Sequence, residues 1–158
     1  DQQVGPGDPR RRPVRRLNAT RVARDEAAQP GGFFLGAPLR VLDSITEALD
    51  GLPGQVVVSG SHGGVSAGRF ALQARVALAV FNDAGVGLDG AGIAALPLLQ
   101  AHGIAACTVA HDTARIGEAT STLATGVISH TNAAAAALGA QPGLALSAWL
   151  ARLGRGGA

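Results

Sequence analysis

Three short segments combine side chains that can transfer protons with backbone that can approach a ligand. They are Ser59-Gly60-Ser61-His62-Gly63-Gly64, Asn82-Asp83 and His111-Asp112-Thr113-Ala114-Arg115. An imidazole changes its charge near neutral pH, and a neighbouring carboxylate can orient it or share its proton. The pattern therefore favours acid/base chemistry, with His62, Asp83 and Asp112 as the candidate catalytic residues.

Other groups in these segments are suited to holding a substrate. Glycine lets a ligand approach the backbone, so the amides of the first segment could bind an anion or a developing oxyanion. Arg115 could reach a carboxylate or phosphate, and His130 either joins the site or precedes a helix cap. The candidate substrate-binding residues are Ser59, Gly60, Ser61, Gly63, Gly64, Asn82, His111, Arg115 and His130.

Each of these residues also has a structural interpretation. His62 could cap backbone groups in a tight turn between a strand and a helix. Asp83 could form a turn, as Asp often does after a strand. Arg115 could form a salt bridge with Glu118 or Asp112.

The chemistry needs elements that bring the segments together. Apolar runs predict strands at 38–43, 55–59, 76–81, 104–110 and 127–129. Helical spacing and end signals predict helices at 44–50, 65–75, 91–102, 113–122, 131–138 and 142–153. Continuous apolar strands that alternate with helices are typical of a mostly parallel sheet with helices on both faces. We therefore expect a three-layer α/β sandwich with a central sheet of four to five strands, Rossmann-like or caspase-like. Right-handed crossovers then place the three segments at one edge, where ligands bind.

The composition removes several classes of chemistry. All 13 basic residues are Arg, so Schiff-base lysine chemistry and a P-loop lysine are excluded. Cys107 is the single cysteine, which excludes an internal disulfide and a Cys-rich zinc site, fits a cytoplasmic protein and is expected to be buried. No apolar run approaches the length of about 18 residues that a membrane span needs. We expect no cofactor, although mixed His and carboxylate ligands would suit a divalent metal.

The basic charge belongs to one end of the chain. Residues 1–32 are rich in Arg, Pro and Gly and hold seven Arg and four acids, a balance of +3. Residues 33–158 hold six Arg and seven acids, a balance of −1, and form the single predicted domain. The first 32 residues are therefore predicted to be a flexible arm, either a solvated leader or a segment that binds nucleic acid or another subunit. Nucleic acid is not an expected partner of the domain itself.

Two of the segments resemble those of caspase-like cysteine peptidases. In that fold a hydrophobic strand leads into a His-Gly block and the next strand leads into an Asp-Ala-Cys block. Ser59-Gly60-Ser61-His62-Gly63 is similar to the first block and Asn82-Asp83-Ala84-Gly85 to the second. Gly85 stands where the nucleophilic cysteine would be, and Cys107 is a whole strand away. The resemblance therefore implies an inactive relative and not a working peptidase.

Two further comparisons are weaker. Four glycines followed about 20 residues later by an acid are similar to the Rossmann phosphate turn and its ribose-binding acid, although the spacing is not G-x-G-x-x-G. These residues are Gly60, Gly63, Gly64, Gly68 and Asp83. In a serine hydrolase, Ser61 or Ser59 could be the nucleophile with His111 or His130 as base, but the G-x-S-x-G elbow is absent.

The sequence thus favours a small-molecule enzyme that acts by acid/base chemistry on a small polar or anionic substrate. His62 would transfer the proton, and Asp83 would orient the His62 ring or share its proton. Hydrolase is the favoured class, and an isomerase or lyase would use the same parts. The alternative is a non-catalytic ligand-binding or assembly subunit, an inactive relative of a caspase-like fold. A homo-oligomer or a subunit of a larger complex is expected in either case.

Overall fold

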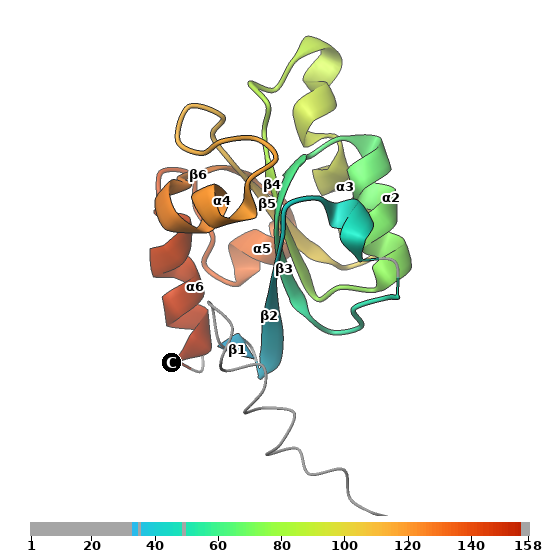
Figure 1. Cartoon of the computed structure of the whole chain (residues 1–158), viewed down its shortest axis with the longest axis vertical. Coiled ribbons are helices and arrows are strands. Elements are labelled where there is room, and N and C mark those ends of the chain that lie inside the picture. Colours follow the sequence, from blue (N-terminus) through green and yellow to red (C-terminus); the bar gives the residue numbers. More distant parts are fainter. Residues whose placement is uncertain (1–32, 35, 49, 156–158) are drawn as a thin grey trace, which may run out of the picture.

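The computed structural model describes residues 33–34, 36–48 and 50–155, so the predicted arm at 1–32 lies outside it. A six-stranded sheet lies between two layers of helices (Figure 1). The strands are β1 (Phe33–Phe34), β2 (Ala37–Leu42), β3 (Val56–His62), β4 (Leu78–Asn82), β5 (Ala105–Val109) and β6 (Ile128–Thr131). The helices are η1 (Ile45–Glu47), α2 (Val65–Ala74), η2 (Leu88–Ile93), α3 (Ala95–Gln100), α4 (Ala119–Thr125), α5 (Ala133–Ala137) and α6 (Leu146–Gly154).

The strands lie in the sheet in the same order as in the chain. Strands β2 to β5 are parallel, and the outer strands β1 and β6 run antiparallel to their neighbours. Every residue of β4 and β5 is buried, as expected for strands covered on both faces. The predicted mostly parallel α/β sheet is confirmed. The additional strand is β1, whose two residues are too few to give a sequence pattern.

Alternating residues of the strands face two separate cores. One core packs η1, α2 and α3 against the sheet, and its strand residues include Val57, Ala79, Phe81 and Ala106. The other packs α5 and α6 against the opposite face, and its strand residues include Val56, Val58, Val80 and Cys107. Figure 1 shows α2 and α3 on one side of the sheet and α4 and α6 on the other.

Helix α2 buries small residues rather than large ones. The spacing predicts Val65, Phe70 and Leu72 as inner contacts; Phe70 and Leu72 are partly buried and pack against the core, but Val65 is 44% exposed. The buried positions are Ala67, Gly68, Ala71 and Ala74. A Cβ on Gly68 would lie 3.1 Å from Ala95, so the close approach of α2 and α3 selects small side chains at this face.

The predicted helix at 91–102 is two helices. Asp89 and Gly90 have left-handed backbone conformations and interrupt η2. Pro97 lies in the first turn of α3, where a missing N–H costs nothing, so it does not kink the helix. The capping box predicted at Ser44 and Glu47 is present at η1.

The helix predicted at 113–122 begins later than expected. Residues 110–118 form a loop, and α4 starts at Ala119. The Thr113 hydroxyl does not cap a helix; it donates to the Ala110 carbonyl and accepts the Val127 N–H. These bonds tie the loop to the start of the next strand. Among the described residues, no helix combines the length and the apolar character needed to cross a bilayer.

Candidate functional site

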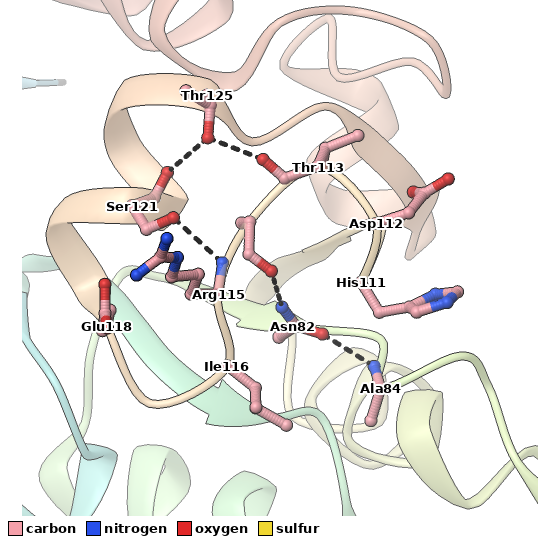
Figure 2. Close-up of a pocket in the computed structure, with 11 residues that line it drawn as sticks. Asn82, Ala84, His111, Asp112, Thr113, Arg115, Ile116, Glu118, Ser121 and Thr125 are labelled. Carbon is pink, nitrogen blue, oxygen red and sulfur yellow. Dashed lines mark hydrogen bonds between the residues drawn. The ribbon is translucent and has the colours of Figure 1, made fainter.

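A crevice opens where the chain leaves β4 and β5 in opposite directions. After β4 the chain passes to the layer of α2 and α3, and after β5 it passes to the layer of α4 and α6. Neighbouring strands whose connections diverge in this way create a natural ligand site. A cavity of about 870 Å³ lies here, lined by Asn82 and Ala84 from the end of β4, by residues of the loop 111–118, and by α4 (Figure 2).

Asp83 is a buried carboxylate directly behind His111, which lines this cavity. Its side chain is 6% exposed, and its Oδ1 accepts the N–H groups of Gly85 at 2.8 Å and His111 at 3.0 Å. The His111 Nδ1 lies 3.5 Å from Oδ1, and the His130 Nδ1 lies 4.0 Å from Oδ2. One carboxylate is therefore flanked by two imidazoles from the ends of two different strands.

The surroundings of Asp83 hold it in the ionised state. Burial by itself would raise its pKa, but hydrogen bonds from the Gly85 N–H, the Ser129 hydroxyl and the His111 N–H, together with the nearby His111 ring, outweigh burial. The pKa of Asp83 is therefore below its ordinary value of 3.8. An ionised, buried carboxylate can orient an imidazole and stabilise the imidazolium that forms when a proton is taken up.

The lowered pKa predicts how stability depends on pH. Because the folded state favours the ionised form, Asp83 contributes stability above its ordinary pKa and loses it as pH falls through the lower folded value. Asp83→Asn keeps one acceptor oxygen, so it should reduce the free energy of unfolding at pH 7 by about 1–2 kcal/mol. In urea titrations, the difference from wild type should shrink as the pH falls below 3.8. Asp112→Asn removes an exposed carboxylate and is the control; an equal pH effect in both variants would contradict this role for Asp83.

The loop after β5 presents the other charged groups. His111, Asp112 and Arg115 are all exposed. Figure 2 shows the Arg115 guanidinium on the side of Ser121 and Glu118, with His111 and Asp112 on the other side of Asn82. Among the described residues, Arg115 makes no ion pair with a carboxylate. Its charge is therefore available to a ligand.

The hydroxyl groups of the cavity, in contrast, hold its walls together. The Ser121 Oγ accepts the Arg115 N–H at 2.9 Å, and the Thr125 hydroxyl donates to the Thr113 carbonyl at 2.6 Å. The Thr113 hydroxyl is bound to backbone on both sides, as described above. The charged groups thus remain as the free polar groups of this cavity, while the hydroxyls shape it.

Asn82 joins the two loops that form the crevice. It is fully buried, its Nδ2 donates to the Ala114 carbonyl at 3.2 Å, and its Oδ1 accepts the Ala84 N–H at 2.8 Å. The sequence suggests substrate binding for Asn82. In the fold its amide group bonds to backbone, which suits a residue that positions the walls of the cavity.

The serine hydroxyls after β3 have partners inside the fold. Ser59 is fully buried, and its hydroxyl donates to the Val80 carbonyl at 2.8 Å. Ser61 Oγ accepts the Ile45 N–H at 2.9 Å and so fixes the start of η1. Both side chains therefore link neighbouring elements, and we do not include them among the groups that contact substrate.

The glycine amides of the same segment are also committed. The N–H groups of Gly60 and Gly63 donate to the carbonyls of Asp43 and Asn82, and that of Gly64 donates to the carbonyl of His62. These three groups were expected to bind an anion. Because they are hydrogen-bonded to backbone in the fold, an oxyanion cannot use them without breaking those bonds.

His62 lies next to this crevice but faces a different cavity. Its Cα is paired with that of Asn82 in the β3–β4 ladder, which places it at the predicted edge of the sheet. Its exposed side chain lines a cavity of about 430 Å³ together with Val65, Ala84 and Val86. The histidines within 4.0 Å of the Asp83 carboxylate, among the described residues, are His111 and His130.

His130 occupies a position that the sequence does not reveal. The segment was expected to follow a parallel strand, but β6 is antiparallel to β5, and His130 lies inside it opposite Thr108. The N-terminal end of β6 therefore meets the C-terminal end of β5. This reversal brings Ser129, which sequence reasoning did not select, against the His130 Nδ1 at 3.2 Å and the Thr108 hydroxyl at 2.9 Å. The one available signal was its position beside His130.

Two connections touch through backbone at the same edge, the one after β3 and the one after β4. A Cβ on Gly63 would lie 2.6 Å from the Gly92 carbonyl oxygen, and a Cβ on Gly92 would overlap the carbonyl oxygen of Asp83. The loop between Asp83 and Gly92 includes Val86 at φ 69°, a backbone conformation that is strained for a β-branched side chain. Such strain is found most often at ligand sites and requires firm support from the surroundings.

Cys107 takes no part in this site. It is fully buried in β5, and burial raises the pKa of its thiol to about 12. A thiol in this state is a poor nucleophile, in agreement with the expectation of a buried cysteine. Among the described residues, no three His, Cys, Asp or Glu side chains are grouped so that they could hold a metal ion.

The comparisons with known proteins give no further guide. The chain matches no family model, no curated protein and no solved structure.

Proposed function

We propose that the chain is an enzyme that carries out acid/base chemistry on a small polar or anionic substrate in the cavity beside Asn82. The observation that carries this proposal is the His111 imidazole, 3.5 Å through Nδ1 from the buried Asp83 carboxylate, at the wall of that cavity. This arrangement leaves the His111 Nε2 for proton transfer. His111 thus takes the role that the sequence assigned to His62.

The remaining parts have separate roles. Asp83 orients His111 and stabilises its protonated form. Asn82 fixes the distance between the loops after β4 and β5 through its hydrogen bonds to Ala84 and Ala114. Arg115 supplies a positive charge for a carboxylate or phosphate of the substrate. Hydrolysis is the reaction that we favour, with His111 taking a proton from the attacking water. The same groups would serve an isomerase or a lyase.

Arg115→Gln should raise KM for an anionic substrate about tenfold or more and leave kcat within about threefold, because a charge-assisted contact made before the reaction contributes about 1.5–3 kcal/mol. The assay uses 4-nitrophenyl acetate, 4-nitrophenyl phosphate and the 4-nitrophenyl monoester of succinic acid. Arg152→Gln, which removes an exposed charge on α6, is the control. An equal KM for the neutral and anionic esters in wild type would remove this role of Arg115.

The enzyme proposal itself is tested on the same panel. Wild type should hydrolyse at least one of the two anionic esters above the rate of a His111→Gln, Asp83→Asn double variant. Assays with EDTA and with added Zn²⁺ or Mn²⁺ report any dependence on metal. Equal rates for wild type and the double variant on every ester would contradict the hydrolase. If the chain is instead a ligand-binding subunit, it should bind the anions through Arg115, and the rate of ester hydrolysis should not depend on His111.

A further inference from the structure

A third cavity is lined in part by His130. Its volume is about 540 Å³, and it is bounded by η2 and α3 on one side and by β6 and the start of α5 on the other. Its walls are mainly apolar, with Ile93, Leu96, Pro97 and Ala133 among them. Small-molecule sites have volumes of roughly 300–1,000 Å³, apolar walls and a few polar groups that set the orientation of the ligand. The cavity has these properties.

The Gln100 amide and the His130 ring each keep a polar atom that can meet a ligand. Gln100 Oε1 accepts the Ala134 N–H at 2.8 Å, which leaves the amide NH₂ of Gln100 as a donor. The His130 Nδ1 is engaged by the Ser129 hydroxyl at 3.2 Å, which leaves Nε2. Asn132 also lines the cavity, but its side chain bonds to four backbone groups, those of Leu96, Ile104, Ala106 and Ala135.

The charges around the cavity select against an ionised ligand. Asp83 lies behind His130, with 4.0 Å between its Oδ2 and the His130 Nδ1, and Asp89 lies at the rim. Both carboxylates repel an anionic head group. A cationic ammonium head group has no lone pair to accept a hydrogen bond from the Gln100 NH₂, so it would leave that donor unpaired. A neutral carbonyl accepts from the Gln100 NH₂ without either cost.

We infer that this cavity is a second binding site, distinct from the one beside His111, for a small neutral molecule with an apolar body and a carboxamide or similar carbonyl group. The apolar body packs on Ile93, Leu96 and Pro97. The carbonyl oxygen accepts from Gln100, and an N–H or O–H of the ligand donates to the His130 ring. This inference does not depend on the proposed reaction, because none of these contacts involves His111 or Arg115.

The test uses three ring compounds of similar size and different charge, namely benzamide, benzoate and benzylamine. They are titrated into the full chain and followed by ¹H–¹⁵N correlation spectra. Benzamide should give saturable shifts at the amides of Ile93, Thr131 and Ala133, and it should bind about tenfold more tightly than the two ions. Tighter binding of benzoate or benzylamine, shifts confined to the loop 111–118, or the absence of saturable shifts would overturn the inference.

A matched pair of substitutions on one short helix adds a second test. Ala133 lines the cavity and Ala136 does not, and both are exposed residues of α5. Ala133→Phe should occupy the cavity and weaken benzamide binding about tenfold, whereas Ala136→Phe should leave it within about twofold. An equal loss in both variants would contradict the assignment. The shift map of the wild-type chain stands on its own if Ala133→Phe does not fold.

Discussion

His111→Gln is expected to lower kcat about 10³-fold for the anionic ester that wild type hydrolyses best, within the 10²–10⁴-fold range of general acid/base catalysis. Glutamine keeps the backbone N–H that donates to Asp83 but cannot take up a proton. KM should change less than about threefold, because the anion is held by Arg115 and not by His111. The measurement is steady-state kinetics, which reports kcat and KM separately for wild type and the variant.

Two other histidines make this test selective. His102→Gln removes an exposed histidine between α3 and β5, at the end of β5 opposite the crevice, and should leave kcat unchanged. His62→Gln separates the two candidate bases, since His62 faces the neighbouring cavity. A 10³-fold loss in His62→Gln with normal activity in His111→Gln would restore the assignment that the sequence favours.

Gly92→Ala is expected to have the largest effect on folding, with a loss of about 3 kcal/mol or more in the free energy of unfolding, at or above the upper end of the cost of overpacking. The added methyl group would overlap the backbone carbonyl of Asp83, which cannot rotate away as a side chain could. The loop cannot easily withdraw, because the Gly92 N–H donates to the Val86 carbonyl at 2.6 Å and the Ala95 N–H donates to the Gly63 carbonyl at 2.8 Å. Urea denaturation measures the loss as a lower midpoint.

Gly103→Ala is the matched glycine control. Gly103 has φ 71° and open space around its Cβ position, so alanine there carries only the cost of a left-handed backbone, about 1–2 kcal/mol. If Gly92→Ala costs no more than Gly103→Ala, the loop is more compliant than the close backbone contact implies. In that case the strained Val86 conformation would not need the support that we assign to it.

The sequence predicts the fold where one physical signal dominates. The strands predicted at 55–59 and 76–81, around the apolar runs 56–58 and 76–81, correspond to β3 and β4, and the capping box at Ser44 is present in full. Local signals fail where a contact distant in sequence decides the structure. Thr113 carries a helix-cap signal, but its hydroxyl bonds to Val127, so the chain stays in a loop until Ala119.

The site is predictable at the level of the sheet edge but not at the level of its side-chain partners. Strand ends place Asp83 and His111 together because β4 and β5 are adjacent and parallel. Nothing in the sequence shows that β6 reverses direction, which brings His130 and Ser129 to the same carboxylate. Nor does it show that the amides of Gly60, Gly63 and Gly64 are satisfied by backbone carbonyls. Both facts depend on tertiary contacts.

The order of the strands has a consequence for how the molecule assembles. Each strand pairs with the one that follows it in the chain, so the sheet can extend in chain order and closes shorter loops than a permuted strand order would need. During synthesis on the ribosome, however, Asp83 emerges well before His111, Ser129 and His130, which surround its carboxylate later. The nascent chain therefore carries a hydrated carboxylate in a partly built sheet, and the surroundings of Asp83 are complete only when β6 has joined the sheet.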